Sequence, residues 1–175
     1  MRYDSRTIAL HWVTAGLVIA LWIIGQTADL IPRGPLRDAY WSLHFTLGFL
    51  FVAVLLVRIV WRSSGGSHLP PAERGILQIA ATSTHYLLYA LMIAVAALGL
   101  ANAFAHGVSL FGIVHFPRLA DHAQAESIGD LHELAANAVL ALAALHAIAG
   151  LAHHYLRHDT VLQRMLPNHA LRGSK

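Results

Sequence analysis

The sequence contains no cysteine, and Asp, Glu, Lys and Arg together make up only 12% of its 175 residues. Without cysteine the chain cannot form disulfides, use a cysteine nucleophile or hold an iron–sulfur cluster through thiolates, so any redox centre must use other ligands. Hydrophobic residues make up 57% of the chain, a share that is atypical of a soluble protein when charge is so low. The composition therefore favours a membrane protein.

Charged residues are missing altogether from four stretches of the chain. These stretches are residues 7–28, 39–57, 75–117 and 134–156. A helix rises about 1.5 Å per residue, so each stretch is long enough to cross about 30 Å of hydrocarbon. We therefore predict an all-α membrane protein whose single domain, residues 1–175, is a bundle of four transmembrane helices. These helices are expected near residues 7–27, 40–61, 77–103 and 131–156.

The longest connection between these helices is "AHGVSLFGIVHFPRLADHAQAESIGD". Its apolar first half is suited to the membrane interface, where it could cover a site that faces outward. Asp130 followed three residues later by Glu133 resembles a capping box. The last helix is therefore expected to begin there, just before His132.

Lysine and arginine are distributed unevenly between the two sides of the predicted bundle. One side holds nine of them, whereas the other holds only Arg33, Arg37 and Arg118. The positive-inside rule places the richer side, with both termini, in the cytoplasm. The net charge of +3 then reflects topology, and a nucleic-acid partner is not needed to explain it. The nine are Arg2, Arg6, Arg58, Arg62, Arg74, Arg157, Arg164, Arg172 and Lys175.

Histidines occur in all four predicted helices. His132 and His146 are 14 residues apart on the last helix, which places them roughly 21 Å apart and within about 40° of the same face. His44 begins the second helix from the side where His132 begins the fourth, so we expect these two at similar depth as a pair. His146 lies in the other half of the membrane. There, both His11 and His85 are open as its partner, and depth leans toward His85 because His11 is expected to lie shallower.

Such pairs suggest a cofactor. Two imidazoles that face each other across a bundle can bind haem iron from both sides, and iron held in this way has no open site, which suits electron transfer. Two pairs would stack two haems across the bilayer. The competing interpretation is that these are polar side chains satisfied by neighbouring helices, or, for His11 beside Trp12, a residue at headgroup level. Ionisable residues inside a membrane usually have a function, so we favour haem ligation.

Five segments carry a recognisable pattern: "ALHW", "HFTLG", "THYLLYALMIAVAALGL", "LHELAANAVLALAALHAIAGLAHHY" and "DTVLQRMLP". Together they resemble the bacterial cytochrome b561 family, including its superoxide oxidase members, over nearly the whole chain. The resemblance implies a four-helix protein of the bacterial inner membrane with two b haems that exchanges electrons with ubiquinone. By position it implies that His11 and His146 hold the inner haem, while His44 and His132 hold the outer one.

The resemblance also implies a reaction. A superoxide oxidase would take an electron from superoxide at the outer face, pass it through both haems and reduce ubiquinone. His85 and His153 are left on the inner half without a ligand role. Because histidine can hydrogen-bond a quinone carbonyl and supply a proton near neutral pH, we expect both to line or adjoin a ubiquinone site.

Four outer residues are candidates for attracting the superoxide anion, although membrane arginines also commonly anchor on lipid phosphates. They are Arg33, Arg37, Arg118 and His115. The alternative function is that of an electron-transfer subunit of a larger dehydrogenase or hydrogenase. In that case the outer haem would receive electrons from a docked redox partner.

Overall fold

The computed structural model describes residues 2–167, which form four long helices joined by short connections. The helices are α1 (Ser5–Thr27), α2 (Pro35–Ser64), α3 (Gly75–His106) and α4 (His122–Tyr155). The smaller elements are the 3₁₀ helices η1 (Ala28–Leu30) and η2 (Leu162–Met165) and the antiparallel strands β1 (Ser109–Leu110) and β2 (Val114–His115). All four long helices are long and apolar enough to span a membrane. The prediction of an all-α, four-helix membrane protein is confirmed.

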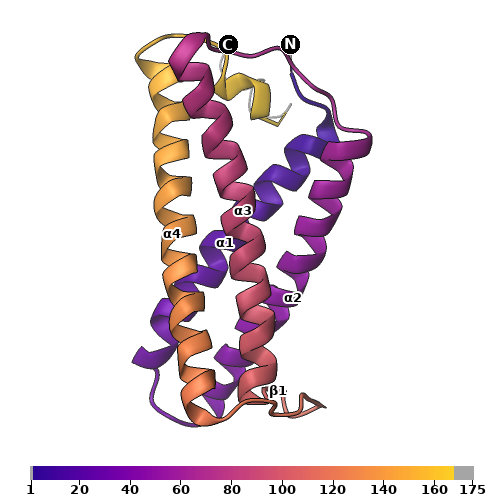
Figure 1. The fold of residues 1–175 in the computed structure, drawn as a ribbon, viewed down its shortest axis with the longest axis vertical. Coiled ribbons are helices and arrows are strands. Elements are labelled where there is room, and N and C mark those ends of the chain that lie inside the picture. The colour runs from indigo at the N-terminus through magenta and orange to yellow at the C-terminus, as the bar shows by residue number, and fades with distance from the viewer. Residues whose placement is uncertain (1, 168–175) are drawn as a thin grey trace.

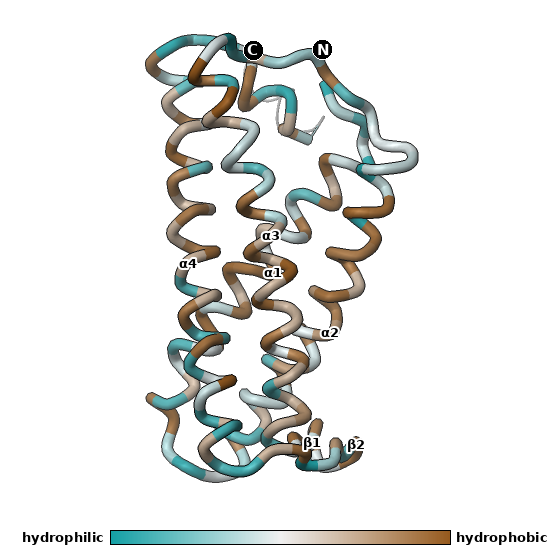
Figure 2. Tube along the Cα trace, viewed as in Figure 1, coloured by the Kyte–Doolittle hydropathy of each residue, from teal (hydrophilic) through white to brown (hydrophobic). Residues whose placement is uncertain are grey.

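The four helices alternate in direction. The two ends of the described chain therefore lie together with the α2–α3 connection, at what we call the terminal end, while η1 and the β1–β2 hairpin lie at the opposite, hairpin end (Figure 1). α1 packs mainly against α2, and α3 packs along α4. Hydrophilic residues gather at both ends, as Figure 2 shows. This is the pattern expected of a bundle whose middle lies in hydrocarbon.

The start of α4 differs from the sequence prediction. The helix begins nine residues earlier, at His122, and its cap is Asp121. The side chain of Asp121 accepts a hydrogen bond from the Gln124 backbone N–H at 2.8 Å, while the Gln124 side chain accepts one from the Asp121 N–H at 3.3 Å. The predicted capping box at Asp130 and Glu133 was therefore wrong. Both residues lie inside the helix, because the chain offers the same acid and Glu/Gln spacing one segment earlier.

The connection from α3 to α4 folds back over the start of α2. The Ser42 hydroxyl donates to the Ser109 carbonyl at 3.2 Å and accepts from the Phe111 N–H at 3.0 Å. Gly107 ends α3 in the left-handed conformation, with φ 66°, and an added Cβ there would lie 2.8 Å from the Cβ of Arg118. A glycine is therefore required where the chain turns. The β1–β2 hairpin therefore contacts α2 at Ser42, two residues before His44.

The hydrophobic core lies at mid-height. Phe51 and Leu55 of α2, Met92 of α3 and Val139 of α4 are its buried members. Val139 is seven residues from both His132 and His146, or about 10 Å along the helix in each direction. The core thus separates two histidine levels on α4.

A cluster around Asp4 fastens the terminal end. Its carboxylate caps α1 by accepting from the Thr7 N–H at 2.9 Å, and it also accepts from the Ser67 hydroxyl at 2.9 Å and the Trp61 indole at 3.2 Å. Partial burial acts to raise the pKa of Asp4, but the hydrogen bonds from Thr7 and Ser67 outweigh it and hold the pKa well below its ordinary value. The charged carboxylate therefore links α1, α2 and the α2–α3 connection.

Candidate functional site

One histidine pair joins α2 and α4 in the half of the bundle near the hairpin end. The ring centres of His44 and His132 are 6.2 Å apart, and the ring planes are nearly perpendicular. The Nδ1 atom of His132 lies 3.1 Å from the Val95 carbonyl of α3. Because a carbonyl can only accept, this nitrogen carries the proton and donates it, so Nε2 is available as a metal ligand.

A glycine lets the His132 ring lie close to a neighbouring helix. A Cβ added to Gly99 of α3 would come within 2.8 Å of the His132 ring, whereas one added to Gly25 of α1 would meet the His44 ring at an ordinary 3.5 Å. The Nδ1 atom of His44 is buried beside the Leu21 backbone without a hydrogen bond of good geometry. Both rings are thus held by close packing.

The second group of histidines lies toward the terminal end, around His146 of α4. Its ring centre is 6.3 Å from that of His11 on α1 and 5.2 Å from that of His85 on α3. The structure therefore brings both sequence-predicted alternatives next to His146. The distance from the His146 ring centre distinguishes His11 from His85.

The separations can be compared with the geometry of iron ligation. An imidazole nitrogen binds a first-row metal at about 2 Å and the ring centre lies roughly 1 Å behind it, so two rings on opposite sides of one iron have centres about 6 Å apart. The pairs His44–His132 and His11–His146, at 6.2 and 6.3 Å, fit this value. The pair His85–His146, at 5.2 Å, is about 1 Å too short. The donor sets therefore fit haem iron at two levels.

Arg58 of α2 lies beside the second pair, although sequence reasoning counted it among the charges at the membrane surface. Its guanidinium donates to the Tyr89 hydroxyl at 3.1 Å and to the Leu10 carbonyl at 3.5 Å, and it lies 3.2 Å from His11 Nδ1. The sequence signal was an arginine flanked by Val57 and Ile59. Such a residue inside an apolar helix usually has a functional partner.

His85 is exposed on α3, one turn before Tyr89. Its Nδ1 lies 2.7 Å from the Ala81 carbonyl of its own helix, so Nδ1 donates and, in the neutral ring, Nε2 has no proton. The side chain is thus exposed while its ring lies against His146.

His153 lies further toward the terminal end of α4, among carboxylates. Its Nδ1 is 2.5 Å from an Asp159 oxygen and its Nε2 is 3.5 Å from a Glu73 oxygen, and Glu73 also pairs with Arg157. Burial acts to raise the pKa of Asp159, but hydrogen bonds from His153 and from the Val161 backbone outweigh it and lower that pKa. Both ring nitrogens of His153 therefore face acids, and the cluster ties α4 to the α2–α3 connection.

The four outer candidates all lie at the hairpin end. Arg37 forms an ion pair with Asp29, whereas Arg33, Arg118 and His115 are exposed. The Nε of Arg118 donates to the Ala120 carbonyl at 3.2 Å. The structure therefore leaves Arg33 and Arg118 with the most accessible positive charge.

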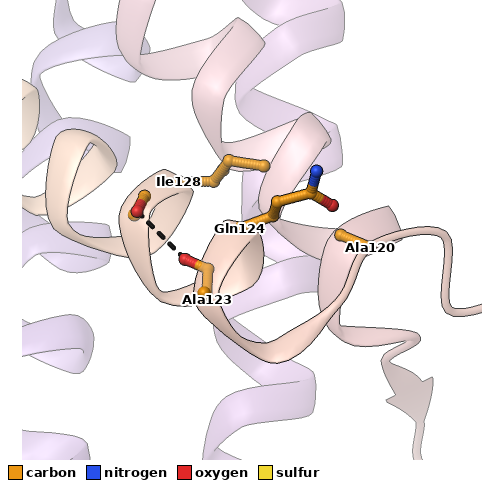
Figure 3. A pocket seen from close by; sticks show the side chains of 5 residues that line it. Ala120, Ala123, Gln124 and Ile128 are labelled. Atoms are coloured by element: carbon orange, nitrogen blue, oxygen red, sulfur yellow. Dashed lines mark hydrogen bonds between the residues drawn. The ribbon is translucent and has the colours of Figure 1, made fainter.

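A shallow groove lies on the first turns of α4, immediately after Arg118 in the chain. Figure 3 shows the small and polar side chains that line it, where the Ser127 hydroxyl donates to the Ala123 carbonyl at 3.0 Å. Its lining residues are Ala120, Ala123, Gln124, Ser127 and Ile128. The groove is mainly apolar and holds none of the predicted site residues.

Comparison with known proteins identifies the family of the chain. The family model for prokaryotic cytochrome b561 matches residues 2–168, and the chain belongs to this family. It is 31% identical to cytochrome b561 homolog 2 of Escherichia coli K12, over 94% of this chain and 91% of that protein. It is 29% identical to the "Probable superoxide oxidase CybB" of Yersinia pestis, over 95% and 96%. It is also 32% identical to cytochrome b562 of Cereibacter sphaeroides, over 94% of each.

Family membership confirms the predicted membrane location and the predicted role in electron transfer. The chain is a multi-pass membrane protein of the bacterial inner membrane that acts in electron transfer, and the family implies b-type haem. The predicted resemblance to cytochrome b561 is likewise confirmed.

Proposed function

We propose that the chain is a superoxide:ubiquinone oxidoreductase with two b haems, one between His44 and His132 and the other between His11 and His146. The observation that carries the proposal is the presence of two opposed imidazole pairs at two levels of the bundle, with ring centres 6.2 and 6.3 Å apart. Haem bound by two histidines supplies one-electron transfer without an open coordination site. The residues supply its position, its orientation and the charges around it.

The terminal end is proposed to face the cytoplasm. Arg33, Arg37 and Arg118 are the arginines at the hairpin end, whereas the surface of the terminal end carries twice as many among the described residues, and this difference supports the orientation. Arg172 and Lys175, also counted from the sequence, lie outside the described residues. The six arginines of the terminal end are Arg2, Arg6, Arg62, Arg74, Arg157 and Arg164.

Superoxide would meet the hairpin end. Arg33 and Arg118 supply exposed positive charge there, His115 lies nearby on β2, and Arg37 contributes less because Asp29 pairs with it. Positive charge attracts the superoxide anion and raises the rate of encounter. The name of the Yersinia pestis relative supports this substrate.

Ubiquinone would bind beside the histidines that lie toward the terminal end, around His146. His85 is exposed and contacts His146, and its Nε2, once it carries a proton, can hydrogen-bond the quinone and pass that proton to it. His153, set between Asp159 and Glu73, is proposed to exchange protons with the cytoplasmic side. The reaction balances when two superoxide anions give up one electron each and leave as oxygen, while ubiquinone takes both electrons and two protons to become ubiquinol.

The proposal can be tested with the purified, haem-loaded protein. Superoxide should reduce the haem absorbance, ubiquinone should restore the oxidised spectrum, and superoxide dismutase should abolish the reduction. Replacing Arg33 and Arg118 together by glutamine should slow the superoxide step about tenfold at low salt and flatten its salt dependence. If superoxide leaves the haems oxidised while dithionite reduces them, the protein is instead an electron-transfer subunit that awaits a redox partner.

A further inference from the structure

The two histidine pairs differ in the group that faces the non-ligating ring nitrogen. At the outer pair, His132 directs Nδ1 at the Val95 carbonyl, which can only accept a hydrogen bond. At the inner pair, the positively charged Arg58 guanidinium lies 3.2 Å from Nδ1 of His11. The two sites therefore place different groups beside the same kind of ligand: a neutral carbonyl with its negative end toward the ring at one, and a full positive charge at the other.

The position of Arg58 is fixed by several contacts. The Tyr89 hydroxyl and the Leu10 carbonyl accept from it, and its guanidinium carbon lies 5.5 Å from the centre of the Tyr89 ring. Within residues 2–167, no carboxylate forms an ion pair with Arg58. Its positive charge is therefore uncompensated in a helix that spans the membrane, where electrostatic interactions are stronger than in water.

We infer that Arg58 raises the reduction potential of the haem held by His11 and His146 above that of the haem held by His44 and His132. Adding an electron lowers the positive charge at the iron, so a neighbouring cation stabilises the reduced state. A histidine whose N–H donates to a carbonyl is a more basic ligand, which stabilises the oxidised state at the outer level. The difference favours electron flow from the hairpin end toward His85. This inference rests on the proposed function, because it requires both haems.

The test is a spectroelectrochemical titration of the purified holoprotein. Arg58→Met should lower the equilibrium constant for reduction of the inner haem at least tenfold, a shift of about 59 mV for one electron, and leave the outer haem unchanged. Arg58→Lys, which keeps the charge, should restore most of the potential. Arg62→Met is the matched control, because Arg62 lies one turn further along α2 and bonds the Ser67 carbonyl at the surface. This variant should keep both wild-type potentials.

A second measurement covers the case in which Arg58→Met fails to fold or loses haem. In His132→Ala only the inner haem remains, and in His146→Ala only the outer one, both with Arg58 in place. The remaining inner haem should have the higher potential. Equal or inverted potentials, or an Arg58→Met shift shared by both haems, would overturn the inference while the proposed function stands. A wild-type protein with fewer than two haems per chain would instead overturn the proposed function, and the inference with it.

Discussion

The two histidine pairs of this bundle have nearly the same ring separation but different surroundings. At the outer level, His132 is held by a carbonyl and by the absence of a side chain at Gly99, and within residues 2–167 no charged side chain forms a hydrogen bond or ion pair with either ring. At the inner level, His146 has two imidazole neighbours, and Arg58 adds an uncompensated charge. The outer level therefore holds its imidazoles by a neutral hydrogen bond and by packing. The inner level adds a third imidazole, His85, which the proposed function places beside ubiquinone.

The largest expected effect is the loss of one haem at a time. His132→Ala should remove the outer haem and spare the inner, and His146→Ala should do the reverse, because each pair is built from its own residues at its own level. The haem content of the purified protein, measured as the pyridine complex, should fall by half in each variant. Loss of both haems from either variant would show that the two levels do not bind independently.

The inner level can be divided further by comparing His11 with His85. His11→Ala should lose one haem because its ring separation from His146 fits iron ligation. His85→Ala should keep two haems and slow reoxidation by ubiquinone at least tenfold, through loss of a proton donor. The pyridine complex gives the haem content, and stopped-flow absorbance at the haem bands gives the rate of reoxidation. If His85→Ala loses a haem and His11→Ala does not, His85 is the ligand.

A smaller effect is expected from crowding the outer level. Gly99→Ala places a Cβ 2.8 Å from the His132 ring, and overpacking of this kind costs typically about 1–3 kcal/mol. The outer haem should therefore dissociate at a lower temperature than the inner one. Gly129→Ala is the control, because its added Cβ meets only Asn102 at an ordinary 3.7 Å. Equal loss of both haems in Gly99→Ala would contradict the packing account.

The smallest effect should come from pH at the terminal end. Because hydrogen bonds lower the pKa of Asp4 below its ordinary 3.8, its charge stabilises the folded state above that value, and the contribution is lost as pH falls below about 4. Asp4 caps the helix that carries His11, so the inner haem should be released first on heating in acid. Asp4→Asn should flatten this pH dependence, whereas replacing the exposed Asp130 by asparagine should leave it unchanged.

Much of the site could be predicted because, along a helix that crosses a membrane, the number of residues from the helix end gives the depth of a side chain. The 14-residue spacing on α4 and the entry sides of the helices correctly indicated which imidazoles lie together. Depth alone leaned toward His85, and His11 was chosen through the family resemblance; both rings lie against His146. The ring separation, which sequence spacing does not contain, supports His11.

Other features were missed for identifiable physical reasons. The start of α4 was predicted at Asp130 because Asp130 and Glu133 have the spacing of a capping box, but the same spacing at Asp121 and Gln124 forms the cap. Arg58 was counted as a surface charge because its partner Tyr89 is 31 residues away on another helix. For His153, the carboxylates of Glu73 and Asp159 come together only through the tertiary fold.

The measurement that tests the central claim most directly is the haem content and spin state of the wild-type protein. We expect two haems per chain, determined as the pyridine complex against protein concentration, with low-spin signals in the absorption and electron paramagnetic resonance spectra of the oxidised protein. This result follows from two bis-histidine sites. One haem per chain, or a high-spin signal from iron with a free coordination site, would contradict the account.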